Sequence, residues 1–281
     1  MTRATTQSPL LSRTAMKKRI AVAGALLPCF FLVPGSARAS DGRLEINQAC
    51  VATGCFPGDA PGFPVQTAAG QSYVLTSSLA VPDANTTAIQ LGDNSALDLG
   101  GFRIEGVTSC SASPTLCTNT GTGIGVAASS GSVRNGRIRQ MGSHGIRGSG
   151  LVVENVIVDG NGGDGISGAG GPVGWMVRGC RIQLNGGDGI DLNVGAGSDG
   201  AVVERNVIRR NGAVGVAGVE LLIRDNAIVG NDSYGIGSNA GGGTVAAYGG
   251  NYLTDNFGAN PEVSGGVQLG PNSCNGNPTC P

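Results

Sequence analysis

The chain has 281 residues, 51 of them glycine, with 4% aromatic and 13% charged residues. Its 18 basic and 19 acidic residues give a formal net charge of −1 at pH 7. This near-neutral, turn-rich composition argues against a nucleic-acid groove or a surface for anionic membranes, because both need a large excess of basic residues.

The first 39 residues have the pattern of a secretory signal. A basic segment, Met16–Arg19, precedes an apolar stretch, Ile20–Val33, and Ala37–Ala39 has the small-x-small pattern of a cleavage site. We therefore expect residues 1–39 to be removed on export and the mature chain to be secreted or periplasmic. The apolar stretch is shorter than the roughly 20 residues that a membrane-spanning helix needs, so no membrane span is expected in the mature chain.

The cysteines agree with an oxidising compartment. Six of the seven that follow the signal form close pairs, namely Cys50 with Cys55, Cys110 with Cys117, and Cys274 with Cys280. We expect three local disulfides, because a zinc site would need Cys-x-x-Cys spacing or several histidines and the chain has one histidine.

Three segments follow the signal in chain order. Residues 40–72 are rich in proline and glycine and are expected to form an N-terminal cap over the first exposed strand edges of a repeat array. Residues 73–256 carry the repeats, and residues 257–281 are expected to cap the other end.

The repeat is aligned on the asparagine that opens the hexapeptide NGGDGI, found at Asn161–Ile166 and again at Asn185–Ile190. The same register recurs every 20 to 26 residues, at Met141, Asn161, Asn185, Asn211, Asn231 and Asn256. Aliphatic residues stand three positions before the anchor, at Ile138, Val158, Ile182, Ile208, Ile228 and Leu253. A second aliphatic column, each time preceded by glycine, stands five positions after it, at Ile146, Ile166, Ile190, Val216 and Ile236.

These columns predict two inward aliphatic stacks. Each glycine before the second stack is expected at positive φ, and the anchor asparagines are expected at left-handed corners where their amides hydrogen-bond from coil to coil.

Two further columns set the strand pairing. The position five residues before the anchor reads Gly136, Val156, Cys180, Asn206, Asn226 and Asn251, so Cys180 is predicted to be a small buried residue rather than a reactive thiol. The position seven residues before it alternates in charge, through Arg134, Glu154, Arg178, Glu204 and Arg224. Alternation is expected of neighbours about 4.8 Å apart on adjacent strands. The sequence therefore predicts an all-β, single-domain parallel β-helix, right-handed by the crossover rule.

The recurring pattern V-x-x-N-x-I-x-x-N-x-x-x-G-I, as in Val202–Val216 and Leu221–Ile236, resembles the right-handed parallel β-helix repeats of the pectate-lyase-like superfamily. The resemblance is clear from Val133 to Asn256. It implies a secreted protein whose partner is an extracellular polysaccharide, since many relatives are pectate lyases, polygalacturonases or uronan epimerases, while others are adhesins or tailspikes.

The chain also departs from these enzymes. No lysine follows Lys18, which excludes a lysine base in the mature chain. The Asp-Pro-His run of the epimerases and the paired-Asp and Gly-His-Gly segments of the polygalacturonases are missing. Arginine-based pectate lyases stay open, without a recognisable signature. The pattern thus specifies the fold more strongly than a reaction.

One group of titratable residues is expected to gather on one face of three successive coils: His144, Arg147, Asp164, Asp188 and Asp191. Asp164 and Asp188, one coil apart, could form an acid–base pair for cleaving a polysaccharide, with His144 and Arg147 beside them. Asp164, Asp188 and Asp191 could instead share a calcium ion, although no other cofactor is expected. In a structural alternative the aspartates accept hydrogen bonds at glycine-rich turns, and His144 and Arg147 offset their charge.

Two functions stay open on these grounds. The chain is either a secreted protein that presents a rigid binding face to a polysaccharide, or a polysaccharide-degrading lyase or hydrolase that uses Asp164 and Asp188. An enzyme is expected to show a groove bounded by the loops 169–174 and 193–200. Trp175, which follows the first of these loops, is interpreted as packing rather than as a sugar platform. The basic cluster of Arg205, Arg209 and Arg210 is interpreted as a solvated outer face, and no pattern indicates an oligomeric state.

Overall fold

The computed structural model describes residues 42–112, 114–169, 174–192, 200–237, 246–256 and 261–280. The predicted signal, residues 1–39, lies outside the described residues. All described residues belong to one compact unit. Its one helix in these ranges is α1, Gln48–Val51, and no described helix is long and apolar enough to cross a membrane.

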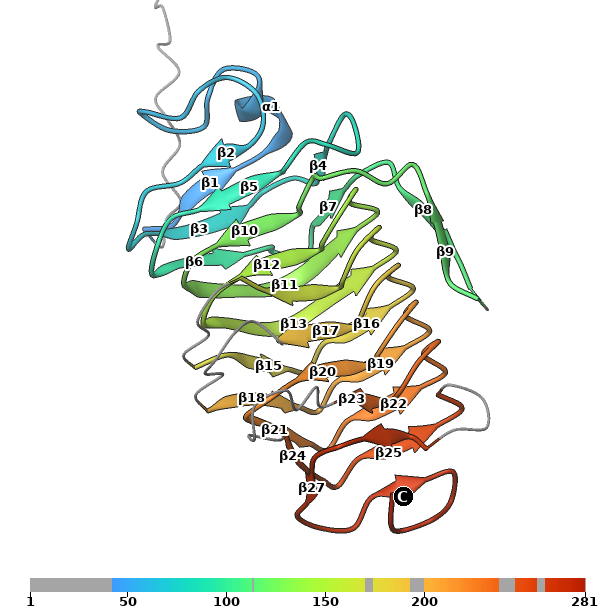
Figure 1. Ribbon diagram of the computed structural model, residues 1–281. Helices are drawn as coiled ribbons and strands as arrows, with labels where there is room; N and C mark the ends of the chain where they lie inside the picture. Colours follow the sequence, from blue (N-terminus) through green and yellow to red (C-terminus); the bar gives the residue numbers. More distant parts are fainter. Residues whose placement is uncertain are drawn as a thin grey trace, which may run out of the picture. The chain divides into compact units, whose positions relative to one another are not determined.

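The strands form two large parallel sheets and one small antiparallel hairpin (Figure 1). The 17-stranded sheet, called the long sheet, contains β1 (Leu44–Ile46), β3 (Ser72–Leu75), β4 (Leu79–Ala80), β6 (Ser95–Asp98), β7 (Arg103–Glu105), β11 (Gly131–Arg139), β13 (Leu151–Asp159), β15 (Met176–Arg178), β16 (Arg181–Gln183), β18 (Ala201–Glu204), β19 (Val207–Arg209), β21 (Leu221–Arg224), β22 (Ala227–Val229), β24 (Ala247–Gly249), β25 (Tyr252–Thr254), β27 (Val267–Gln268) and β28 (Ser273–Cys274). The nine-stranded sheet, called the short sheet, contains β2 (Val65–Gln66), β5 (Ile89–Leu91), β10 (Val126–Ala128), β12 (Ile146–Gly148), β14 (Ile166–Gly168), β17 (Ile190–Leu192), β20 (Val216–Gly218), β23 (Ile236–Gly237) and β26 (Val263–Ser264). The hairpin is β8 (Ser109–Ser111) with β9 (Leu116–Thr118).

Each coil crosses the long sheet twice and the short sheet once. The first crossing forms row 1, which includes β6, the first half of β11 and of β13, β15, β18 and β21. The second crossing forms row 2, which includes β7, the second half of β11 and of β13, β16, β19 and β22. Equivalent strands of successive coils pair in parallel, so the predicted parallel β-helix is confirmed.

Both predicted aliphatic stacks are confirmed. Ile138, Val158, Ile182, Ile208, Ile228 and Leu253 pair in succession and are 0% exposed. The column from Ile146 to Ile236 is equally continuous in the short sheet and equally buried. These stacks are the centre of a single apolar core that runs through the coils.

The prediction of positive φ at the glycines before the second stack is wrong. None of Gly145, Gly165, Gly189, Gly215 and Gly235 has a positive φ. A Cβ placed on Gly189 would lie 2.6 Å from the carbonyl oxygen of Gly215 in the next coil and 2.9 Å from Nδ2 of Asn211. Glycine is required there because the neighbouring coil comes too close for any side chain.

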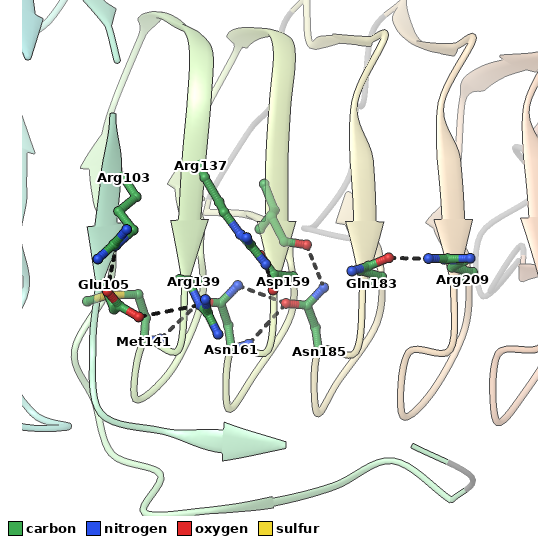
Figure 2. Close-up of polar contacts among 11 residues, drawn as sticks. Arg103, Glu105, Arg137, Arg139, Met141, Asp159, Asn161, Gln183, Asn185 and Arg209 are labelled. Carbon is green, nitrogen blue, oxygen red and sulfur yellow. Dashed lines mark hydrogen bonds and ion pairs between the residues drawn. The ribbon is translucent and has the colours of Figure 1, made fainter. Parts of the chain in front are cut away.

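Two ladders of buried asparagines follow two corners of the coils. Asn161, Asn185, Asn211, Asn231 and Asn256 form the first ladder, and Asn206, Asn226, Asn251 and Asn272 form the second. In the first ladder the backbone N–H and Nδ2 of each asparagine donate to Oδ1 of the next, at 2.7 to 3.2 Å, as Figure 2 shows for its first step. The predicted coil-to-coil bonding of the amides is thus confirmed.

The left-handed residue, however, is not the asparagine but the residue before it. Positive φ occurs at Leu184 and Arg210 before the first ladder, and at Arg205 and Asp225 before the second. Arg210 is exposed whereas Asn211 is 0% exposed. The bend therefore takes place at an outward residue, which leaves the next side chain directed inward for stacking.

The alternating charges of row 1 are confirmed as neighbours in adjacent strands. Arg134 pairs in register with Glu154, Glu154 with Arg178, Arg178 with Glu204, and Glu204 with Arg224. Arg178 forms an ion pair with Glu154, and Nη2 of Arg224 lies 2.6 Å from Oε2 of Glu204.

The three predicted disulfides are present, and Cys180 is a free, buried thiol. The Cys110–Cys117 bond closes the β8–β9 hairpin, which lies across the corners of later coils. Thr115 in this hairpin donates its backbone N–H to Oδ2 of Asp232 at 2.6 Å and its hydroxyl to the carbonyl of Arg210 at 3.1 Å. Near the N-terminus, β1 pairs with β3 and β2 pairs with β5, so these strands continue the two sheets. The capping role of residues 40–72 and 257–281 remains a prediction.

Candidate functional site

A hollow of about 340 Å³ lies on the outer side of the short sheet. Asp188 and Asp191 line one part of it, and the next coils supply Val214, Ala217, Ser233, Tyr234, Gly237 and Ser264. In the register of the sheet, Ala217 follows Asp191 and Gly237 follows Ala217. Small side chains in the coils after Asp191 therefore leave a depression between the carboxylates and Tyr234.

Asp188 is held at the edge of this hollow by a bond to the next coil. Its Oδ1 accepts the backbone N–H of Val214 at 2.7 Å. Within the described part of the chain, no group donates to its Oδ2. One oxygen thus has a structural contact, and the other is available to a ligand.

The environment of Asp188 favours its protonated form. Burial raises the pKa of Asp188 to about 7, and the charges of Asp164 and Asp191 add to this effect, although the N–H of Val214 opposes it. A carboxyl group that titrates near neutral pH can donate or accept a proton under ordinary conditions.

Asp164, one coil earlier, is engaged on both oxygens. Its Oδ1 accepts the backbone N–H of Asp188 at 2.9 Å, and its Oδ2 lies 3.2 Å from Nδ1 of His144. Burial disfavours its charge, but the contacts with His144 and with the N–H of Asp188 hold the pKa of Asp164 below its ordinary value. Asp164 therefore stays ionised and acts as a connecting residue between coils.

His144 continues the same series of contacts. Its Nδ1 lies 3.1 Å from the backbone nitrogen of Asp164, whose N–H donates to it. A neutral ring can accept this hydrogen bond at Nδ1, whereas a ring protonated at Nδ1 donates to Oδ2 of Asp164 instead. His144, Asp164 and Asp188 form a continuous ladder at the turns before the short sheet.

The five residues singled out in the sequence therefore separate into two groups. Asp188 and Asp191 line the hollow, while His144 and Asp164 contact each other outside its lining. Arg147 pairs in register with Ser167 and is exposed. In the described ranges no three His, Cys, Asp or Glu side chains form a group that could hold a metal ion, and calcium binding by Asp164, Asp188 and Asp191 stays a prediction.

Sequence reasoning did not assign roles to Ser233, Tyr234 or Ser264. Tyr234 occupies the same column as Asp188, two coils later, so the alignment contained the signal. The alignment also places Ala217 and Gly237 in the neighbouring outward column, but the hollow that they leave depends on distances between coils, which the alignment does not contain.

The two loops expected to bound a groove lie mainly outside the described residues, since 170–173 and 193–199 are not described. Trp175 is 1% exposed, so its interpretation as a packing residue is confirmed. Its ring is closed to solvent and cannot serve as a sugar platform.

Comparison with known proteins identifies the fold. A family described as "Right handed beta helix region" matches residues 69–257, which is more than half of the chain. No curated protein matches the sequence.

Two solved structures are similar to this chain, both A-modules of mannuronan C-5 epimerases from Azotobacter vinelandii. The AlgE4 module is 15% identical with a TM-score of 0.48, covering 79% of this chain and 70% of that one. The AlgE6 module is 17% identical with a TM-score of 0.42, covering 79% of this chain and 68% of that one. At these identities the similarity concerns the fold alone. From the family match over most of its coils, the chain belongs to the right-handed β-helix family.

Proposed function

We propose that this protein is a secreted polysaccharide-binding protein and that one part of the polysaccharide occupies the hollow beside Asp188. The observation that carries the proposal is the combination in one hollow of two carboxylates, a tyrosine and two serines. Its volume of about 340 Å³ is at the lower end of small-ligand sites, which measure roughly 300–1,000 Å³.

The lining suits a hydroxyl-rich ligand. Carboxylate and hydroxyl oxygens accept hydrogen bonds from sugar hydroxyls, and the tyrosine ring offers an apolar surface with a polar tip. None of the described residues that line the hollow is basic, so an uncharged part of the polysaccharide is expected there. Three disulfides agree with function outside the reducing cytoplasm.

A second candidate function is cleavage of the bound polysaccharide, and a specific observation favours it. The pKa of Asp188 is raised to about 7, while that of Asp164 is lowered. Two neighbouring carboxyl groups with separated pKa values can supply a proton donor and a charge that stabilises a cationic transition state. In this scheme Asp188 is the donor, because its Oδ2 is not engaged by the described residues.

Binding is tested first, by affinity electrophoresis and calorimetry against neutral and acidic polysaccharides, with and without calcium. Tyr234→Ala is expected to weaken binding of a ligand so identified by about tenfold, because the ring forms one wall of the hollow. Tyr252→Ala is the matched control, since Tyr252 is exposed in β25, near the C-terminal end of the long sheet and away from the hollow. Equal affinities of the wild type and Tyr234→Ala would exclude the hollow as the binding site.

Turnover is tested separately, by the release of reducing ends and of unsaturated products. If Asp188 donates a proton, Asp188→Asn abolishes turnover but preserves binding. The wild-type rate then falls as the pH rises above about 7, because the protonated form is lost. Binding without turnover at any pH would support a binding protein and exclude the enzyme.

A further inference from the structure

Row 2 carries an unusual concentration of arginine on its outer side. Between β7 and β19 this row and its bends contain seven arginines, namely Arg103, Arg137, Arg139, Arg181, Arg205, Arg209 and Arg210. The same outer positions contain two carboxylates, Glu105 and Asp159. The near-zero net charge of the chain therefore conceals a strongly basic face, of which Figure 2 shows a part.

Four of these arginines already have polar partners. Glu105 interacts with Arg103 at 2.7 Å and with Arg139 at 3.7 Å, and Arg137 forms two bonds of 2.6 Å to Asp159. In a separate pair, Nε of Arg209 donates to Oε1 of Gln183 at 3.0 Å, which leaves the charge of Arg209 uncompensated. Figure 2 shows these contacts, of which the Arg103–Glu105 pair lies within β7 and the others join successive strands.

Arg181 and Arg205, like Arg209 and Arg210, have no carboxylate partner in the described part of the chain. Both side chains are exposed. They line a common hollow of about 320 Å³ together with Asn155, Gly179 and Val207.

The hollow exists because a bend position lacks a side chain. Asn155, Gly179 and Arg205 occupy the same left-handed bend in three successive coils. A Cβ on Gly179 would lie 2.7 Å from Oδ1 of Asn155, so glycine keeps the space open between the asparagine and Arg205. Two cations on neighbouring coils that share an open hollow repel each other, and an anion bound between them relieves that repulsion.

The arrangement of the basic face indicates the class of anion. Its arginines lie in four of five successive coils, a length of about 20 Å along the coil axis, in a stripe one strand row wide; the coil of β13 contributes Asp159 instead. A narrow stripe fits a linear polymer better than a membrane surface, which needs a broad basic patch. All seven cations are arginine, whose planar guanidinium groups bind carboxylate and sulfate with two parallel hydrogen bonds.

We propose that row 2 is a second polysaccharide site, which binds a linear acidic polysaccharide along the coil axis with one carboxylate or sulfate group in the hollow between Arg181 and Arg205. This site is separate from the hollow beside Asp188, since its residues lie in the long sheet. It gives the protein two faces of opposite charge for different parts of an extracellular matrix.

The experiment measures the affinity of the disulfide-bonded protein for oligogalacturonate, heparin and neutral dextran. Wild-type protein is expected to bind oligogalacturonate or heparin but not dextran through row 2, with affinity that falls as salt rises from about 20 to about 200 mM. Arg181→Ala and Arg205→Ala should each weaken binding about tenfold, because each removes a charge-assisted contact. Arg147→Ala removes the same charge from an exposed position in the short sheet and should leave the affinity within about twofold.

Three results would overturn the proposal. They are no binding of either acidic polymer, an equal loss of affinity in Arg147→Ala, and stronger binding to phosphatidylglycerol vesicles than to the polymers. Arg181→Ala separates the two sites, since it should weaken binding of the acidic polymers and leave binding of a neutral polysaccharide at the Asp188 hollow unchanged. A result that excludes ligand binding at the Asp188 hollow therefore does not exclude binding of an acidic polysaccharide along row 2.

Discussion

The backbone N–H of Asp188 donates to Oδ1 of Asp164 across one coil, at 2.9 Å. The same contact recurs one coil later, where Val214 donates to Oδ1 of Asp188 at 2.7 Å. The two carboxyl groups therefore share one structural task. They differ in the second oxygen, which in Asp164 lies beside His144 and in Asp188 has no donor among the described residues. This difference, rather than the presence of two aspartates, distinguishes a structural carboxylate from a candidate functional one.

The first prediction concerns the pH dependence of stability. The pKa of Asp188 is about 7 in the folded chain, against an ordinary value of 3.8, so the folded state binds the proton more tightly than the unfolded state. Its contribution to the free energy of unfolding is complete below about pH 4 and is lost as the pH rises through about 7. Asp188→Asn keeps an oxygen for the N–H of Val214 without a charge. We expect the variant to be more stable than the wild type by about 2 kcal/mol near pH 8, a value already reduced for solvent screening of the carboxylate. Near pH 4 the two proteins should be equally stable.

Urea unfolding at the two pH values measures this difference. Asp93→Asn is the control, because Asp93 is an exposed carboxylate in a turn, and it should change stability by less than about 0.5 kcal/mol at either pH. A loss of stability in Asp188→Asn at both pH values would show that the turn requires the ionised carboxylate.

The second prediction concerns the first asparagine ladder. Asn211→Ala removes the Oδ1 that accepts two bonds from Asn185, and it leaves Oδ1 of Asn231 without the side-chain donor. All these groups are buried, so the free energy of unfolding should fall by about 2 to 4 kcal/mol. Val207→Ala, at a position 41% exposed, should cost less than about 1 kcal/mol in the same urea titration. Similar losses in the two variants would mean that the ladder contributes no more than a surface contact.

The third prediction concerns the spacing of the coils. Gly189→Ala places a Cβ 2.6 Å from the carbonyl oxygen of Gly215, which belongs to the backbone and cannot rotate away. We expect a loss of at least about 3 kcal/mol, or failure to fold, as judged by thermal unfolding and by the yield of soluble protein. Gly270→Ala provides the control, because its Cβ meets no atom within 4 Å and its φ is not positive. A change of less than about 0.5 kcal/mol is expected for it.

The fourth prediction concerns the cysteines. Cys180 is 2% exposed, and burial raises the pKa of its thiol to about 11. Since the thiolate is the reactive form, alkylation of the native protein should be slow and should become fast in denaturant. Mass mapping without reduction should recover the three local disulfides with Cys180 free. Rapid labelling of Cys180 in the native protein would show that the second corner opens in solution.

The sequence by itself determined the coil. Residues that repeat with one chemical character, such as the column from Ile138 to Leu253, face one environment in every coil, and parallel pairing gives that column a single register. The asparagine ladders, the alternating charges and the buried Cys180 followed from the same alignment. The three disulfides join cysteines five to seven residues apart, so their pairing could be predicted without knowledge of the tertiary fold.

Tertiary structure decided what depends on distances between coils. The glycines before the second stack were expected at positive φ, but the approach of the Gly215 carbonyl to Gly189 explains them instead, and no single coil contains that information. The two hollows likewise arise where small residues, Ala217 in one and Gly179 in the other, stand between larger neighbours from adjacent coils. The pKa of Asp188 is about 7 because burial and its neighbours in three dimensions set its charge, whereas the sequence reveals only that a carboxyl group is present.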